Sequence, residues 1–62
     1  MKKQEVINTM REWFFPNFFD IDMFDYTQLD DDEVYLIYLQ EKDLFGGEID
    51  EMLEEQHHKG IA

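Results

Sequence analysis

The chain has 62 residues, and its 16 Asp and Glu against five Lys and Arg give a formal net charge of -11. Affinity for nucleic-acid phosphates depends on Lys and Arg, so this balance argues against direct DNA or RNA binding. One Trp, three Tyr and six Phe accompany the acids. That aromatic content favours a folded acidic domain over a disordered acidic tail, and the length allows one small domain spanning residues 1–62.

The chain has no cysteine, so it has neither disulfides nor thiolate metal sites, which fits a cytoplasmic protein. Polar residues at Gln4–Glu5 and Asn8–Thr9 interrupt the N-terminal region, which is therefore not a signal peptide. No stretch approaches the roughly 20 apolar residues of a membrane span. We expect a cytoplasmic protein that does not contact the membrane.

Apolar residues at helical spacing, such as Val6, Met10 and Phe14, predict a helix over residues 4–15. Pro16 is expected to end it, because proline disfavours helical geometry in the preceding residue. Over residues 18–26, apolar residues alternate with Asp, which predicts a half-buried strand with a bulge at Met23–Phe24.

Val34–Leu39 contains six consecutive β-branched, aromatic or aliphatic residues and predicts a second strand. The acidic turn Thr27–Asp32 would close an antiparallel hairpin. A turn at Gly46–Gly47 then precedes a helix over Glu48–His58, with Gly60 as its C-cap. The expected fold class is α+β: a small α-β-β-α domain in which two helices pack on one face of the hairpin.

Clustered carboxylates raise the question of a metal site. Neither Asp30–Glu33 nor Asp20-x-Asp22-x-x-Asp25 supplies the glycine of a calcium-binding loop, so a solvated acidic turn is the better interpretation. Glu54 and His58 share a helix face and would make half of a zinc site, but a charged helix C-terminus explains them better. We expect no metal and no cofactor.

No feature of the sequence indicates catalysis. There is no cysteine nucleophile, no carboxylate pair is marked as buried, and Gly46–Gly47 lacks the Lys-Ser/Thr of a phosphate-binding loop. We therefore expect a protein that is not an enzyme. Around Pro16, five large aromatic rings stand within seven residues, and most of them should be core. Those expected to contact a partner are Trp13, Phe15 and Phe18.

Three phrases resemble the N-terminal region of a family of bacterial insertion-sequence transposases: Phe15–Asp20, Val34–Lys42 and His58–Ile61. The resemblance implies a non-catalytic leading segment, or a truncated reading frame, that acts through protein contacts. It also implies a strand over Val34–Lys42. The contiguous Asp31-Asp32-Glu33 does not match the dispersed catalytic acids of such enzymes, and the chain ends before the basic strand of the family.

Two functions follow as hypotheses. The first is a protein-interaction domain of this transposase-like kind, bound to a protein partner or to a second copy. The alternative is an acidic DNA mimic that inhibits a nucleic-acid-binding protein, such as a phage-type antagonist of a defence nuclease, with further charges over Glu48–Glu55. A solvated surface without a partner is the third interpretation. The acidic surface expected to make contact comprises Asp20, Asp22, Asp25, Asp30, Asp31, Asp32 and Glu33.

Overall fold

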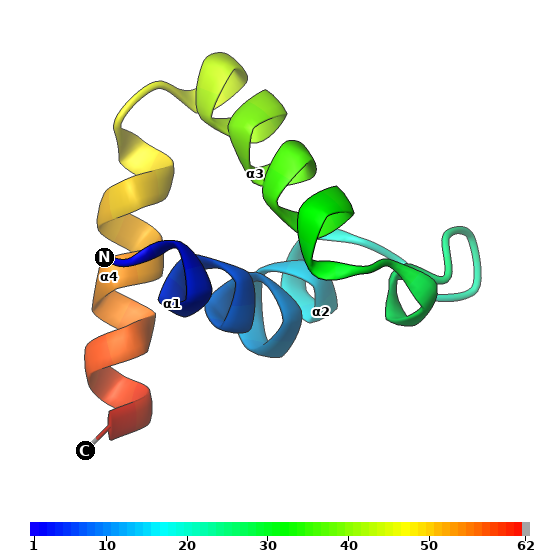
Figure 1. The fold of residues 1–62 in the computed structure, drawn as a ribbon, viewed down its shortest axis with the longest axis horizontal. Coiled ribbons are helices and arrows are strands. Elements are labelled where there is room, and N and C mark those ends of the chain that lie inside the picture. Colours follow the sequence, from blue (N-terminus) through cyan, green and yellow to red (C-terminus); the bar gives the residue numbers. More distant parts are fainter. Residues whose placement is uncertain (62) are drawn as a thin grey trace.

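The computed structural model describes residues 1–61, with side chains up to Lys59. Within that range the chain forms helices and connecting turns and contains no strand (Figure 1). The expected α+β fold with an antiparallel hairpin is therefore wrong. Three helical segments, at residues 3–18, 31–45 and 48–61, pack against one another instead.

The first segment is one continuous helix in three parts: α1 (Lys3–Thr9), a π-helical turn η1 (Met10–Phe14) and α2 (Phe15–Phe18). The Phe15 amide donates to the Met10 carbonyl, five residues back, which marks the wide turn. Pro16 therefore does not end the helix. Phe15 keeps helical angles of φ -60° and ψ -48° directly before the proline, and the chain becomes extended only at Phe19.

The segment expected to be a strand, Val34–Leu39, lies inside α3 (Asp31–Phe45). Its helix signals outweigh the strand preference of its side chains. Asp30 is the N-cap, and its carboxylate accepts a hydrogen bond of 2.8 Å from the Glu33 amide. Acids fill the first turn and Lys42 lies in the last, as the helix dipole favours.

The segment predicted as the first strand, residues 18–26, has no strand partner once residues 34–39 are helical. It forms the end of α2 and a turn, and it leads into a short 3₁₀ helix η2 (Tyr26–Gln28). Arg11 joins this connection to the first helix, because its guanidinium donates to the Leu29 carbonyl at 3.0 Å and to Asp31 at 2.9 Å.

The turn at Gly46–Gly47 is confirmed, and it leads into α4 (Glu48–Ile61). Gly46 has φ +66° and ψ -145°, a backbone geometry that is almost restricted to glycine. Gly60 is not a C-cap, because α4 continues through it to Ile61. Ile49 and Leu53 of this helix are fully buried and face the core.

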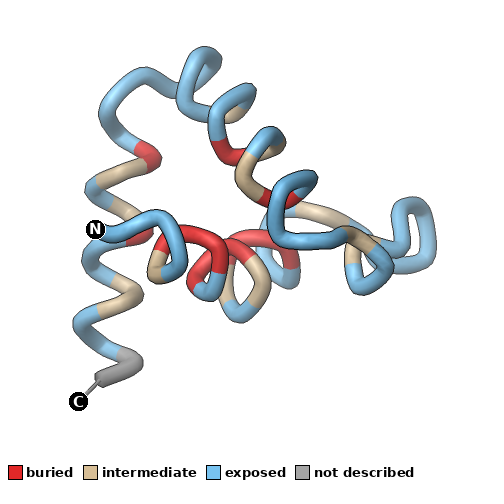
Figure 2. Tube along the Cα trace, in the orientation of Figure 1, coloured by how far each residue is buried: buried red, intermediate tan, exposed pale blue. Residues whose placement is uncertain are grey.

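The core lies where the three helical segments meet (Figure 2). Each segment supplies residues at helical spacing, and the packing of these apolar faces stabilises helices that short length alone would leave marginal. The long first helix contributes the largest share of the core. The buried apolar residues are Val6, Ile7, Met10, Phe14, Phe15, Val34, Tyr38, Ile49 and Leu53.

Candidate interaction surface

Exposed apolar residues alternate with acids over residues 18–25, which we call the docking segment. Met23 is 85% exposed and Phe18 is 49% exposed, and Ile21 and Phe24 are also accessible. Asp20, Asp22 and Asp25 alternate with them and face solvent. In Figure 1 the turn after α2 extends away from the packed helices. The segment therefore presents apolar and acidic groups together.

Hydrogen bonds within the docking segment hold it in one shape. The Asp20 carbonyl accepts from the amides of Met23 at 3.0 Å and Phe24 at 2.9 Å, and the Asp20 carboxylate accepts from the Asp22 amide at 2.9 Å. Asp25 similarly caps η2 by accepting from the Thr27 amide at 3.1 Å. A turn fixed in advance loses less conformational entropy when it binds a partner.

An aromatic cluster anchors the docking segment to the core. The Phe18 ring stacks on buried Phe14 with ring centroids 4.6 Å apart, and Phe19 stacks on Phe15 at 5.2 Å. Phe24 in turn meets the edge of Phe19 at 6.0 Å. The exposed part of the segment is therefore in contact with fully buried residues of the core.

The three aromatic residues expected to contact a partner lie in different environments. Phe18 is exposed, Trp13 is half-buried and Phe15 is fully buried. Phe15 is thus a core residue and does not belong to an accessible surface. Phe15 begins α2 directly after the wide turn, and its ring packs against Phe19 and Tyr26. Sequence analysis also missed Ile21, Met23 and Phe24 as accessible apolar residues, because their alternation with Asp was interpreted as a strand.

The second acidic group, Asp30–Glu33, is not in a turn but at the N-terminus of α3, and the docking segment does not include it. Three of its members have structural partners. Asp30 caps the helix, Asp31 pairs with Arg11 at 2.9 Å and Asp32 lies 3.8 Å from Lys3. Exposed ion pairs of this kind add little stability. These carboxylates still contribute to the negative electrostatic potential at the surface.

Most of the positive charge is neutralised within the molecule. Of the five Lys and Arg residues, four lie within 4 Å of a carboxylate. Lys42 is 3.1 Å from Asp50 and Lys59 is 3.2 Å from Glu55. The other two are Lys3 and Arg11. The field that a partner meets is therefore negative, which favours a basic partner.

A hydrogen-bonded group joins α3 to α4. The Tyr38 hydroxyl donates to the Asp50 carboxylate, which also binds the Lys42 ammonium. These contacts lower the pKa of Asp50, chiefly through the bond from Tyr38. Burial, followed by the Asp50 contact, raises the pKa of Tyr38. Asp50 is thus ionised and Tyr38 is neutral near pH 7.

His57 and His58 do not converge on a metal with Glu54. His57 instead reaches Glu5 of α1 at 2.7 Å, while His58 lies 3.8 Å from Glu54. Among residues 1–59, no three His, Asp or Glu side chains are placed to hold an ion. No helix in the described part of the chain is long and apolar enough to cross a membrane.

The site and fold define a small acidic three-helix domain with a preformed apolar and acidic turn. The chain matches no protein-family model, no curated protein and no solved structure. The likeness to insertion-sequence transposases therefore stays a hypothesis. Its implied strand over Val34–Lys42 disagrees with α3, which is helical throughout.

Proposed function

We propose that this chain is a non-catalytic protein-interaction domain whose docking segment binds a basic and partly apolar surface of a protein partner. The observation that supports it best is the alternation of accessible Ile21, Met23 and Phe24 with Asp22 and Asp25 on a hydrogen-bonded turn. Apolar anchors supply affinity, and the surrounding carboxylates supply orientation and a fast, salt-sensitive approach.

A basic protein suits this surface better than a second copy of the chain. Two copies that meet through the docking segment would bring their aspartates together within a molecule of net charge -11. Like charges across an interface oppose association. The resemblance to insertion-sequence transposases suggests that the partner is another protein encoded by the same insertion sequence. The lack of cysteine favours a cytoplasmic location.

The test is capture of proteins from a lysate of the source cells on the immobilised chain, with paired variants. Met23→Ser with Phe24→Ser removes the anchors of the docking segment. The matched control, Leu44→Ser, removes an apolar group from α3 that is 77% exposed. We expect a basic protein to be lost with the first variant and retained with the control. Equal capture by both variants contradicts the proposal.

A DNA mimic is the second candidate, and the fixed positions of the helical acids favour it. Asp31, Asp32 and Glu33 fill the first turn of α3, and acids also fill the first turn of α4, so rigid helices hold these carboxylates. Such charges would suit a basic groove that normally binds phosphates. Duplex DNA should then release the captured protein. If DNA leaves the complex intact, the mimic is excluded and the docking segment accounts for binding.

A further inference from the structure

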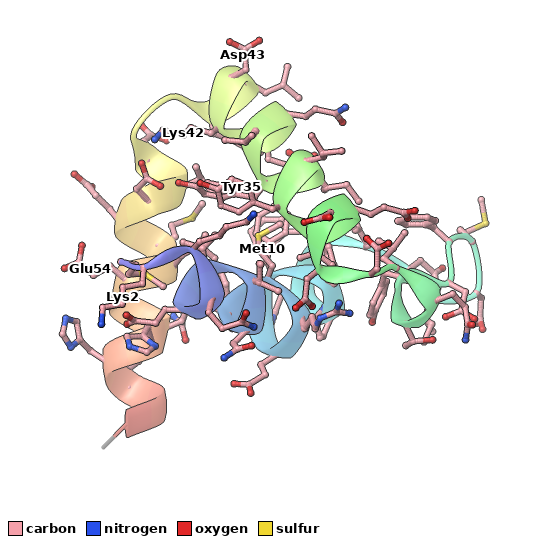
Figure 3. The ribbon with its side chains drawn as sticks, viewed as in Figure 1. Lys2, Met10, Tyr35, Lys42, Asp43 and Glu54 are labelled. Carbon is pink, nitrogen blue, oxygen red and sulfur yellow. The ribbon has the colours of Figure 1, made fainter. Side chains whose placement is uncertain are left out.

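The four methionines of the chain lie in different environments, and the chain has no cysteine to react before them. Met23 is 85% exposed, whereas Met10 is fully buried in the core. Figure 3 shows Met10 where the three helical segments meet. Met52 is partly buried against the core, and Met1 is accessible at the start of the chain. Met23 is therefore the thioether most open to a reagent in solvent.

The docking segment holds the Met23 side chain out in solvent. The Met23 amide donates to the Asp20 carbonyl at 3.0 Å, and the Phe24 amide donates to the same oxygen at 2.9 Å. These bonds fix the backbone of the turn, while the side chain takes no part in the packing of the core. A chemical change at the sulfur would therefore alter the docking segment without unfolding the helices.

A thioether sulfur reacts with hydrogen peroxide without help from other residues. Its lone pair attacks one peroxide oxygen, and the O–O bond breaks as an S–O bond forms. The hydroxide that leaves takes the proton from the sulfur-bound oxygen and becomes water. The sulfur loses two electrons, and the peroxide gains them. The formal charge of -11 does not repel this uncharged oxidant, as it would repel an anionic one.

We propose that Met23 is a reversible oxidation site whose sulfoxide weakens binding through the docking segment. Oxidation replaces a flexible apolar end with a polar S=O group. Such a group is costly to bury against an apolar surface unless it meets a hydrogen-bond donor. A sulfoxide reductase with a dithiol returns the thioether, the dithiol becoming a disulfide and the oxygen leaving as water. The loss of binding rests on the proposed function, whereas the selective oxidation does not.

The first measurement is the rate of oxidation at each methionine, read by peptide mass mapping of the full chain in dilute hydrogen peroxide. In the folded protein Met23 should oxidise first, and Met10 at least about tenfold more slowly, because its sulfur is reached only when the core opens. In urea the two rates should become similar. Equal rates in the folded protein, or a loss of helical circular dichroism when Met23 alone is oxidised, would overturn the proposal.

The second measurement is capture of the basic protein from a lysate of the source cells, before and after oxidation of the immobilised chain. The peroxide is removed before the lysate is added. Oxidation at Met23 should lower capture about tenfold, as expected when one apolar anchor is no longer buried favourably. Sulfoxide reductase with dithiothreitol should restore it. Unchanged capture after complete oxidation of Met23 contradicts the proposal.

Two leucine variants assign the effect to a single sulfur, each compared with its own untreated sample. Met23→Leu has no sulfur at this position and should lose no capture after peroxide treatment. Met52→Leu removes a sulfur from α4 instead and should lose capture as the parent chain does. Met23→Gln, a permanently polar side chain of similar length, should capture as weakly as the oxidised parent. Equal sensitivity of the two leucine variants to peroxide rules out Met23 as the site.

Capture by the serine variant separates the oxidation of Met23 from docking itself. If capture is lost with Met23→Ser and Phe24→Ser but survives oxidation, the effect of the sulfoxide alone is wrong. If capture is unchanged by both serine substitutions while Met23 still oxidises first, the docking segment is wrong, and the loss of binding inferred from oxidation is wrong with it.

Discussion

The Tyr38 hydroxyl on α3 donates a hydrogen bond to the Asp50 carboxylate on α4, across the turn that contains Gly46. Tyr38 is buried, and Asp50 also pairs with Lys42, so the bond joins the core to an ion pair between α3 and α4. Removal of the bond should be measurable both as stability and as a change in the titration of Asp50.

Tyr38→Phe should lower the free energy of unfolding by about 1 kcal/mol, because it removes a hydrogen bond to a charged but partly exposed group. Urea denaturation measures the loss. Tyr35→Phe is the control, since the Tyr35 hydroxyl makes no hydrogen bond to the residues that the structure describes. Equal stability of Tyr38→Phe and the parent chain would show that the bond does not form in solution.

The pH dependence of stability should show the same bond. The pKa of Asp50 is lowered on folding, so its contribution is present above the ordinary value of 3.8 and is lost as pH falls through the folded value. The pKa of Tyr38 is raised, so its contribution is present below 10.0 and is lost as pH rises through the folded value.

Denaturation across pH should therefore give a larger difference between the parent chain and Tyr38→Phe at neutral pH than below pH 3.8 or above pH 10.0. The comparison cancels the general charge repulsion that both proteins share. Parallel curves over the whole range would rule out the predicted linkage.

Gly46→Ala should destabilise the fold by about 1–3 kcal/mol, because a Cβ is strained at φ +66° and ψ -145°. Gly47→Ala is the matched control: no atom lies within 4 Å of its added Cβ, and its φ is outside the left-handed region. Thermal melting distinguishes them. If both substitutions have the same effect, the positive φ at Gly46 is wrong.

Asp30→Ala should cost about 1 kcal/mol and reduce helical circular dichroism, because it removes the N-cap of α3. Asp30→Asn keeps an acceptor oxygen and should retain most of the stability. This pair directly tests whether residues 34–39 are helical. A strand there would leave both variants near the stability of the parent chain.

The outer helices and the glycine turn could be predicted from sequence because helical spacing and glycine geometry are local signals. Residues 34–39 could not, since the same side chains suit a buried strand. The decisive evidence was the acidic N-cap at Asp30, which was interpreted as a turn. A strand at residues 34–39 needs a partner, so residues 18–26 were expected to be a half-buried strand as well. The exposure of Met23 was therefore not expected. The packing of the three helices depends on contacts between residues far apart in the chain, which no local pattern reveals.

The central claim is that the docking segment meets the partner, and site-specific photo-crosslinking tests it most directly. A photoreactive amino acid replaces Met23 in one protein and Leu44, which has similar exposure, in another. In a lysate of the source cells, position 23 should form a covalent adduct with one basic protein, and raised salt should reduce its yield. Crosslinks from position 44 alone, or the same adducts from both positions, would contradict the account.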